Sequence, residues 1–475
     1  MNFSLIALNS LLPAHSRDIP ASSAYSVRTL NQHTEIPVAV GGLPRKLGLV
    51  DAVSIVIGIV IGAGIFLVPN LVAQQMKSAT AILVVWIFAG VISLFGSLAC
   101  AELGTMLPST GGQYVFLREA YGPLIGFLCG WTMFLVARTA QVAWLAVTLA
   151  LYVSYFIPLS ALASKLLGLG AILLFTWINY HAVTAGAMVQ KIFTLAKVSG
   201  LLVIVCSAFL SGSKAEPAAD AASGGFTLNS FGIALIACLL AYDGWVQLSF
   251  VAGEIRNPRR NVLFALAFGS IACIAIYLLA NMAYLRVLTI REIAASEHVG
   301  ATVAEHALGP AGGRLVSLII LLSIIGTLNG CFLTSPRIYF AQARDGLFFQ
   351  KFAEVHPRHQ TPSFAILAQG VWAAVLLVSG SYESLLDYAI FAIWLSYGMM
   401  VAGVIVLRIK RPDLPRPYRV WGYPMTPVAF VAITCWFLLN MILTRPAPSL
   451  AALVLIASGV PVYLLRTRRH SRPHG

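Results

Sequence analysis

Charged residues are scarce in this chain. They make up 10% of its 475 residues, whereas a soluble domain carries about 25%. Hydrophobic residues make up 59%, and runs of about 20 apolar residues, long enough to cross a bilayer, recur along nearly the whole chain. One such run could be the core helix of a soluble protein, but a soluble protein does not contain so many apolar runs of this length. The composition therefore predicts a polytopic membrane protein.

Patterns that would indicate an enzyme or a metal site are also missing. The sequence has no Gly-x-x-x-x-Gly-Lys phosphate loop, no Cys/His metal spacing and no nucleophile–base pair, so no catalysis, cofactor or metal is expected. His181 lies in a loop and is given no ligand role. The cysteines all lie in apolar segments, which predicts small buried side chains and no disulfide framework. They are Cys100, Cys129, Cys206, Cys238, Cys273, Cys331 and Cys435.

The net charge of +14 would suggest a nucleic-acid partner in a soluble protein, but here the basic residues lie in loops and tails, where they set orientation. We expect twelve spans, at about 50–73, 80–106, 122–153, 163–180, 188–211, 229–252, 261–287, 313–341, 363–380, 385–408, 422–443 and 447–466. An even number places both termini on one side. Most of the 31 lysines and arginines lie on that side, which is therefore predicted to be cytoplasmic. We expect a plasma-membrane protein with cytoplasmic tails at 1–44, where no signal peptide is convincing, and 467–475.

Two of the apolar segments contain short glycine-marked breaks. The first reads Gly62-Ala63-Gly64-Ile65-Phe66, and the second reads Ala241-Tyr242-Asp243-Gly244-Trp245. Glycine weakens a helix by about 1 kcal/mol relative to alanine, and an aspartate at membrane depth costs about 2.5 kcal/mol or more. A helix that unwinds to hold a polar substrate uses both, because its freed amides and carbonyls become ligands. The breaks therefore predict a secondary transporter. Its expected substrate-binding residues are Val60, Ile61, Gly62, Ala63, Gly64, Ile65, Phe66, Leu240, Ala241, Tyr242, Asp243, Gly244 and Trp245.

The breaks fall in the first and sixth spans, which suggests an internal repeat. If residues 45–211 and 212–408 form two halves of five spans, each half begins with a broken helix, and the odd number of spans inverts one half relative to the other. Residues 409–466 then hold spans eleven and twelve outside the repeat. The expected fold is an all-α membrane protein with a 5+5 inverted repeat and discontinuous helices 1 and 6. A channel is the structural alternative, but the sequence shows no filter motif or repeated charged ring.

Amides at the start of one half-helix suit a carboxylate, and carbonyls at the end of the other suit an ammonium, so an unwound site suits a zwitterion. Close helix packing is the alternative explanation of the Gly-x-Gly sequence. Lys197 lies within the fifth span, where its ammonium could replace a bound sodium ion; snorkelling to the interface is the alternative, although Lys191 already fills that role. Arg138 is a second deep cation, and a structural ion pair with Asp243 or another partner is expected for it.

Four blocks of sequence carry a family resemblance. They are Gly58–Phe66, Pro108–Tyr114, Ala241–Trp245 running on to Asn261, and Gly326–Gly330 running on to Gly346. With these blocks the chain resembles the amino acid–polyamine–organocation superfamily, and within it the L-type amino acid transporter branch, over roughly residues 45–465. The resemblance implies a leucine-transporter-like fold and alternating-access exchange of amino acids.

The resemblance also implies roles for particular residues. The Ala63 and Gly64 amides would hold the substrate carboxylate. Carbonyls near Val60, and those of Leu240, Ala241 and Asp243, would hold the α-amine. Lys197 would match the lysine that replaces a sodium site in the family.

Three departures from the family pattern matter. Ala63 stands where the family often has Ser or Thr, and Leu240 stands where it often has Phe, so a hydroxyl contact and a gating aromatic are missing. Animal members use a cysteine in the third outer loop to bond a glycoprotein partner. The loop from Tyr155 to Lys165 has none, so we expect no such partner and a prokaryotic protein that is a monomer or weak oligomer.

The sequence thus predicts sodium-independent exchange of neutral L-amino acids. Glu102 and Glu254, at span ends, are expected to serve cytoplasmic closure. A proton symporter and a transporter of cationic amino acids or polyamines remain alternatives, the latter with Asp243 as its acidic group. An amino acid sensor without transport is the alternative from another class, and the short tails argue against it.

Overall fold

The computed structural model describes residues 42–154, 156–211, 227–296, 298–380 and 382–470. In this part of the chain every regular element is a helix, apart from one isolated parallel bridge between Leu47 and Ile255. Ten helices are long and apolar enough to cross a membrane, and two shorter apolar helices, Leu228–Ala241 and Ser363–Ser379, complete a set of twelve. The expected all-α membrane fold is confirmed.

The spans follow the expected order along the chain. In that order they are α1 (Leu49–Val60) with α2 (Gly64–Gln75), α3 (Ala79–Met106), α5 (Pro123–Thr132) with a π-helix (Met133–Ala137) and α6 (Arg138–Ser154), α7 (Ala161–His181), α8 (Val183–Leu210), α9 (Leu228–Ala241) with α10 (Gln247–Phe250), α11 (Pro258–Val287), α14 (Pro310–Thr334) with α15 (Pro336–Arg344), α16 (Ser363–Ser379), α17 (Tyr382–Lys410), α18 (Met425–Thr444), and α19 (Pro446–Ala457) with α20 (Gly459–His470). Shorter helices connect some of them: α4 (Gln113–Tyr121), α12 (Ile290–Ala295), α13 (Val299–Leu308), and 3₁₀ turns at Ala252–Glu254 and Gln350–Ala353.

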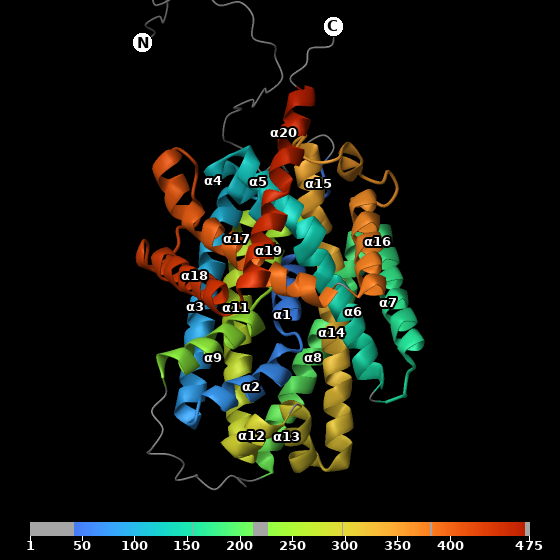
Figure 1. Cartoon of the computed structure of the whole chain (residues 1–475), viewed down its shortest axis with the longest axis vertical. Coiled ribbons are helices and arrows are strands. Elements are labelled where there is room, and N and C mark those ends of the chain that lie inside the picture. Colours follow the sequence, from blue (N-terminus) through green and yellow to red (C-terminus); the bar gives the residue numbers. More distant parts are fainter. Residues whose placement is uncertain (1–41, 155, 212–226, 297, 381, 471–475) are drawn as a thin grey trace, which may run out of the picture. The chain divides into compact units, whose positions relative to one another are not determined.

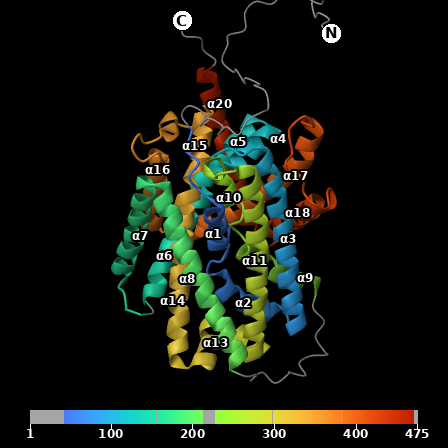
Figure 2. The same cartoon turned by 180° about the vertical axis from the view of Figure 1, so that it is seen from behind.

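The broken first span lies inside the bundle. Helix α1 packs against α8, α11 and α14, and α2 packs against α9, α12 and α13 (Figures 1 and 2). A helix that is apolar on all sides can be buried in this way or face lipid. Here burial of α1 keeps the polar backbone of its break away from hydrocarbon, as the membrane requires.

Several boundaries differ from the sequence prediction. Helix α8 begins at Val183 instead of near residue 188, and α20 continues to His470, past the expected start of the tail at 467. Backbone hydrogen bonds extend a helix beyond its apolar stretch, so hydropathy underestimates these lengths. The expected N-terminal tail lies almost entirely outside the described residues. The division of the repeat between residues 211 and 212 stays a prediction.

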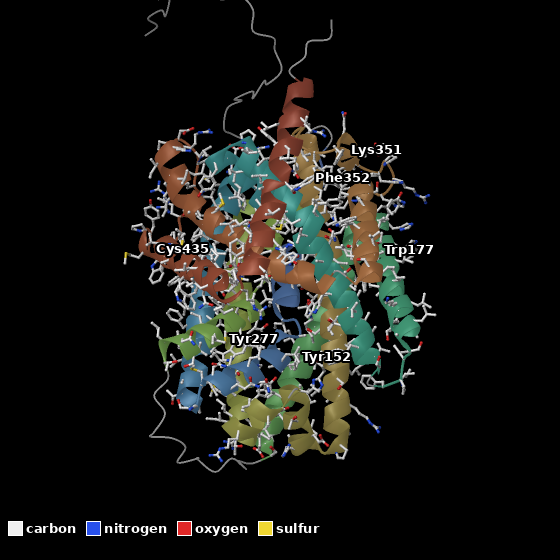
Figure 3. The ribbon with its side chains drawn as sticks, in the orientation of Figure 1. Tyr152, Trp177, Tyr277, Lys351, Phe352 and Cys435 are labelled. Atoms are coloured by element: carbon white, nitrogen blue, oxygen red, sulfur yellow. The ribbon has the colours of Figure 1, made fainter. Side chains whose placement is uncertain are left out.

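The expectation that all seven cysteines are buried was wrong for two of them. Cys206 and Cys435 are exposed, whereas the other five are buried, and all seven are free thiols. Cys435 lies at the periphery, on α18 (Figure 3). A peripheral helix presents apolar side chains to lipid as well as to the protein, so an apolar neighbourhood in the sequence does not imply burial.

Candidate functional site

The first break opens a gap of three residues between α1 and α2. Helix α1 ends at Val60, residues 61–63 are not helical, and α2 begins at Gly64. The Gly62 amide donates to the Val60 carbonyl at 2.8 Å, whereas the amides of Ala63, Gly64 and Ile65 have no backbone acceptor in the described structure. Ala63, the residue that caps α2, offers no side-chain oxygen to them. This helix start therefore presents free N–H groups and a positive dipole end, which suit an anion.

The second break follows α9 and turns sharply at a glycine. Residues 242–246 form a turn between α9 and the single helical turn α10. Gly244 has φ 127°, and a side chain there would clash with the Ile59 Cγ2, 2.7 Å from an added Cβ. A Cβ added to Gly64 would likewise lie 3.1 Å from Ala241. Glycine is therefore needed at Gly244 for the turn and at both positions for the close packing of the two breaks.

Lys197 reaches the first break from α8. Its ammonium donates to the carbonyl oxygens of Gly58 and Ile61, both at 2.8 Å, and to that of Ser323 on α14 at 3.0 Å. The side chain is 1% exposed. The Ser323 hydroxyl also donates to the Ile61 carbonyl, at 2.8 Å. Two carbonyls of the first span and one of α14 thus solvate a buried cation between the first and eighth spans, in the manner of a metal site.

Tyr277, a residue that the sequence prediction missed, joins the two breaks. Its hydroxyl lies 2.8 Å from the Val60 carbonyl oxygen and 3.1 Å from that of Ala241, and can donate to either. Its ring contacts the edge of Trp86 and the ring of Tyr242. Nothing in the sequence distinguishes this tyrosine from others in apolar helices.

Asp243 and Arg138 are connected through a second missed residue, Tyr397 on α17. The Tyr397 hydroxyl donates to Asp243 Oδ1 at 2.6 Å, and Arg138 Nη2 donates to that hydroxyl at 3.2 Å. Arg138 Nη1 also donates to Gln141 at 3.0 Å. The two charges are thus not in direct contact, which corrects the simplest form of the expected ion pair. Arg138 follows directly after the π-helix, and such a bulge shifts the positions of the side chains that follow it.

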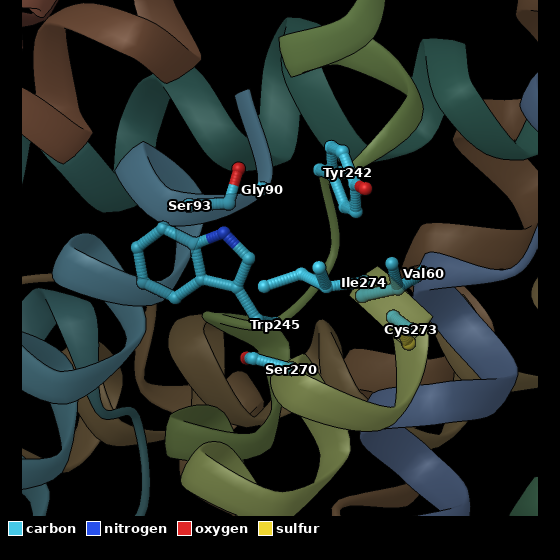
Figure 4. Close-up of a pocket in the computed structure, with 8 residues that line it drawn as sticks. All are labelled: Val60, Gly90, Ser93, Tyr242, Trp245, Ser270, Cys273 and Ile274. Atoms are coloured by element: carbon cyan, nitrogen blue, oxygen red, sulfur yellow. The ribbon is translucent and has the colours of Figure 1, made fainter. Parts of the chain in front are cut away.

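A small cavity lies beside the breaks. It is lined by Val60, Tyr242 and Trp245 from the breaks, by Gly90 and Ser93 from α3, and by Ser270, Cys273 and Ile274 from α11 (Figure 4). Its volume of ≈ 10 Å³ is close to the smallest space that holds one water molecule. This conformation therefore leaves no room for an amino acid in the cavity.

The other expected site residues surround these groups. Ile65 and Phe66 are buried on α2, and the Phe66 ring lies so close to Gly300 of α13 that an added Cβ would be 2.7 Å away. The Trp245 ring packs against that of Tyr397 at 5.4 Å. Leu240 is 36% exposed and does not line the small cavity.

Ion pairs link the helices at the end of the bundle that is expected to be cytoplasmic. Arg337 binds Glu254 through two hydrogen bonds, of 2.7 and 3.2 Å, and both side chains are fully buried. Arg408 binds Glu102 in the same two-pronged way, at 2.9 and 2.7 Å. Leu47, just before α1, donates to the Glu254 carbonyl at 3.0 Å and accepts from the Arg256 amide at 2.8 Å. The contacts of Leu47 and Glu254 join the first, sixth and eighth spans, and the Glu102–Arg408 pair joins the second and tenth.

A third cluster at this end lies outside the spans. Asp345, after α15, accepts hydrogen bonds from Arg118 and from the Tyr114 hydroxyl of α4. Burial, followed by the charge of Asp345, raises the pKa of Tyr114 well above its usual value. The tyrosine therefore stays a neutral hydrogen-bond donor at any physiological pH.

The opposite end is covered by α12 and α13 (Figure 1). The Asn70 side-chain amide, on α2, donates to the carbonyls of Ala294 at 3.0 Å and Ser296 at 2.7 Å, which are at the end of α12. Gln74, one turn further along α2, donates to Ala294 as well, at 3.1 Å. Polar contacts thus tie the broken first span to its neighbours at both ends of the bundle.

Residues 47–461 match the family described as amino acid permease. This chain belongs to the amino acid permease family. The permease is 33% identical over 431 residues to the b(0,+)-type amino acid transporter 1 of Mus musculus, with 89% of this chain and 88% of the relative covered. It is 32% identical to the serine/threonine exchanger SteT of Bacillus subtilis (strain 168), with 89% and 97% covered, and 33% identical to the human cystine/glutamate transporter, with 89% and 85% covered. The permease is accordingly a multi-pass membrane transporter of amino acids and not an enzyme.

Proposed function

We propose that this permease exchanges neutral L-amino acids across the plasma membrane without sodium. The observation that carries the proposal is the position of the Lys197 ammonium among the carbonyls of Gly58, Ile61 and Ser323. Its charge occupies the space that a sodium ion would need, and its three donors satisfy the carbonyls that would bind the ion. Coupling to sodium would require a second cation beside a buried ammonium, which electrostatic repulsion opposes.

In this proposal the substrate binds along the two breaks. Its carboxylate accepts from the free amides of Ala63 and Gly64 at the start of α2, where the helix dipole also favours an anion. Its ammonium donates to carbonyls at the ends of α1 and α9, near Val60 and Ala241. Phe66, Leu240 and Trp245 border the space for the side chain, and Leu240 replaces a larger aromatic lid.

The state of Asp243 favours neutral substrates over cationic ones. A cationic side chain would need an acid free to receive it, but Asp243 already accepts from Tyr397, and the Arg138 charge lies just behind that hydroxyl. SteT and the human cystine/glutamate transporter are named for different substrates, so the family alone does not choose between substrate classes. Cationic amino acids are therefore the second candidate.

We further propose that both termini are cytoplasmic and that no disulfide-linked subunit is needed. Two features support this. The basic loops lie at the end of the bundle that holds the Glu254–Arg337 and Glu102–Arg408 pairs. The segment that joins α6 to α7 contains no cysteine.

Exchange by purified protein in liposomes tests the proposal. Uptake of a panel of labelled amino acids is measured in choline buffer and in sodium buffer at constant pH, with and without an amino acid inside. We expect equal uptake in both buffers, a strong requirement for internal amino acid, and a preference for neutral substrates. Activity only with sodium would refute the role of Lys197. Sodium-independent uptake that rises steeply as the pH falls would make the permease a proton symporter, and preferred uptake of lysine or arginine would favour the second candidate.

A further inference from the structure

An apolar groove runs along α7, on the side of the helix that faces α8. Its volume is ≈ 460 Å³, and it is lined by residues of α6, α7, α8 and α14, among them Leu149, Gly170, Phe193 and Ile325. Every residue that lines this α7 groove is hydrophobic or a glycine. Ligand pockets have volumes of about 300–1,000 Å³, so the groove is large enough for a ligand, and its walls suit an apolar one.

The directions of α7 and α8 open the groove. Helix α7 ends at His181 and α8 begins at Val183, so a single residue joins the two helices. From this connection they diverge toward the opposite end of the bundle (Figure 2). Helix α7 packs mainly against α6 and α16. The groove between α7 and α8 is therefore a wedge that narrows toward the end of the bundle that is expected to be cytoplasmic.

The fold does not fill this wedge with its own side chains. Gly170 lines the groove on α7, and a Cβ added there would meet no atom of the described structure within 4 Å. On the opposite wall, Ile325 belongs to α14, which with α15 is the most buried of the ten long spans, yet its side chain is only partly buried. The groove therefore reaches from the lipid-facing surface to a helix inside the bundle.

The depth of the groove determines what can enter it. Its walls are membrane spans, and the outer face of α7 is apolar, with Leu173 66% and Trp177 61% exposed; Trp177 lies at the periphery (Figure 3). Along α7 the lining extends from Leu166 to Ile178, which is about 18 Å at about 1.5 Å per residue. The hydrocarbon core of a bilayer is about 30 Å thick. The groove thus lies within the hydrocarbon, where the molecules beside the protein are lipid acyl chains.

A cation stands at the wide end of the groove. Lys165 is exposed and directly precedes Leu166, the first lining residue on α7. A lysine near the end of a span extends its ammonium to the headgroup region, where lipid phosphates lie. A phospholipid whose phosphate is near Lys165 would have its chains beside Leu166.

We propose that the α7 groove binds one acyl chain of a membrane phospholipid, with the lipid phosphate near Lys165. The chain lies between α7 and α8 and supplies the dispersion contacts that an empty apolar cavity would lack. Because the groove exists only in the folded protein, the bound lipid stabilises the fold. The proposal is independent of which amino acid the permease transports.

Photo-crosslinking of the full-length protein in lipid nanodiscs tests the proposal. The probes are phosphatidylcholines that carry a diazirine near the middle or near the end of one acyl chain, and peptide mass spectrometry locates the adducts. We expect adducts on Phe193 and Ile325, on the inner walls of the groove. Leu195 of α8, which is 69% exposed, reports lipid at the outer surface and serves as the reference.

Gly170→Trp fills the groove with an indole, and Leu173→Trp is the matched control. Leu173 lies on the same helix but does not line the groove. In Gly170→Trp, the ratio of adducts on Phe193 and Ile325 to those on Leu195 should fall about tenfold, which is about 1.4 kcal/mol in lipid affinity. In Leu173→Trp the ratio should stay at the wild-type value.

Thermal unfolding in detergent gives an independent measurement. Added phosphatidylcholine should raise the unfolding temperature of the wild type and of Leu173→Trp, and should raise that of Gly170→Trp by less. Equal shifts in all three proteins would contradict a lipid site in the groove. If size exclusion shows that Gly170→Trp does not fold, Gly170→Leu fills part of the groove and should lower the adduct ratio by a smaller factor.

Three results would overturn the proposal. The first is a wild type with adducts on Leu195 but none on Phe193 or Ile325. The second is the same result in a protein that elutes as a dimer, which would show that a second copy covers the groove. The third is an adduct ratio unchanged by every folded substitution at Gly170, which would place the lipid outside the groove.

Discussion

The two breaks have similar sequences but are held open in different ways. The first is stabilised from outside, by the Lys197 ammonium and the Ser323 hydroxyl, which satisfy its carbonyls and leave its amides free. The second is stabilised by its own aspartate, which extends from the turn to Tyr397 and through it to Arg138. The first break continues into α2, of twelve residues, whereas the second continues into a single turn of four.

This difference suits the two breaks to different parts of a substrate. An anion needs free amides at the start of a stable helix, and only the first break provides such a helix. A turn with a short continuation mainly presents carbonyls and side chains, and the second break is flanked by the rings of Tyr242 and Trp245. We therefore expect changes at the first break to abolish binding or transport, and changes at the second to alter stability or selectivity.

The largest effect is expected for Gly64→Val. A branched side chain would cover the amides of the first break and press against Ala241, which lies only 3.1 Å from an added Cβ. Titration with amino acid should show no binding by a protein that still elutes as a folded species. Gly170→Val, on α7 and away from both breaks, is the control, because a Cβ there meets no atom of the described structure within 4 Å. Near-normal binding by Gly64→Val would remove the first break from the site.

Lys197→Ala should reduce exchange by roughly 100-fold. The change leaves three carbonyls without their charged donor, and hydrogen bonds to charged groups contribute about 1.5–3 kcal/mol each. Initial rates in liposomes measure the effect. Lys191→Ala on the same helix should alter the rate by only a few-fold at most, because Lys191 is 40% exposed and forms a surface ion pair with Asp51. Similar losses in both variants would contradict a special role for the buried lysine.

Asp243→Asn should lower the free energy of unfolding by about 2 kcal/mol. Breaking a direct buried ion pair costs about 3–5 kcal/mol, and the intervening Tyr397 hydroxyl reduces that figure here. Thermal unfolding in detergent measures it. The double variant Arg138→Met, Asp243→Asn should lose less stability than the sum of the two single changes, because it also removes the charge left alone. Simple additivity would show that the two charges are not coupled.

Leu240→Phe should produce the smallest effect, a shift of a few-fold in preference between small and large apolar substrates. One methylene group more or less in an apolar pocket changes the binding free energy by about 1–3 kcal/mol. Competition by a panel of amino acids measures the shift. Ile233→Phe, a substitution of an exposed residue on the same helix, should leave the profile unchanged. An unaltered profile in Leu240→Phe as well would place Leu240 outside the pocket.

The sequence revealed the parts of the site whose residue types are unusual in a membrane. Glycines in an apolar run, Asp243 and Lys197 all carry a cost in lipid, and that cost marked them as candidates. Tyr277 and Tyr397 carried no such signal, because a tyrosine in an apolar helix is equally typical of the membrane interface. Their roles depend on which helices are neighbours, and hydropathy does not contain that information. Hydropathy also does not say which face of a helix is buried, and for that reason the prediction that Cys206 and Cys435 are buried was wrong.

The bridge between Leu47 and Ile255 couples the start of the first span to the segment that follows the second break. Two backbone hydrogen bonds attach Leu47 to Glu254 and Arg256, although about 200 residues separate them in the chain. Glu254 in turn forms an ion pair with Arg337, so we expect a displacement of this strand-like contact to move the eighth span as well. Arg45 is exposed next to the bridge and lies outside the membrane-spanning helices. A fluorophore attached there should report movement of the second break.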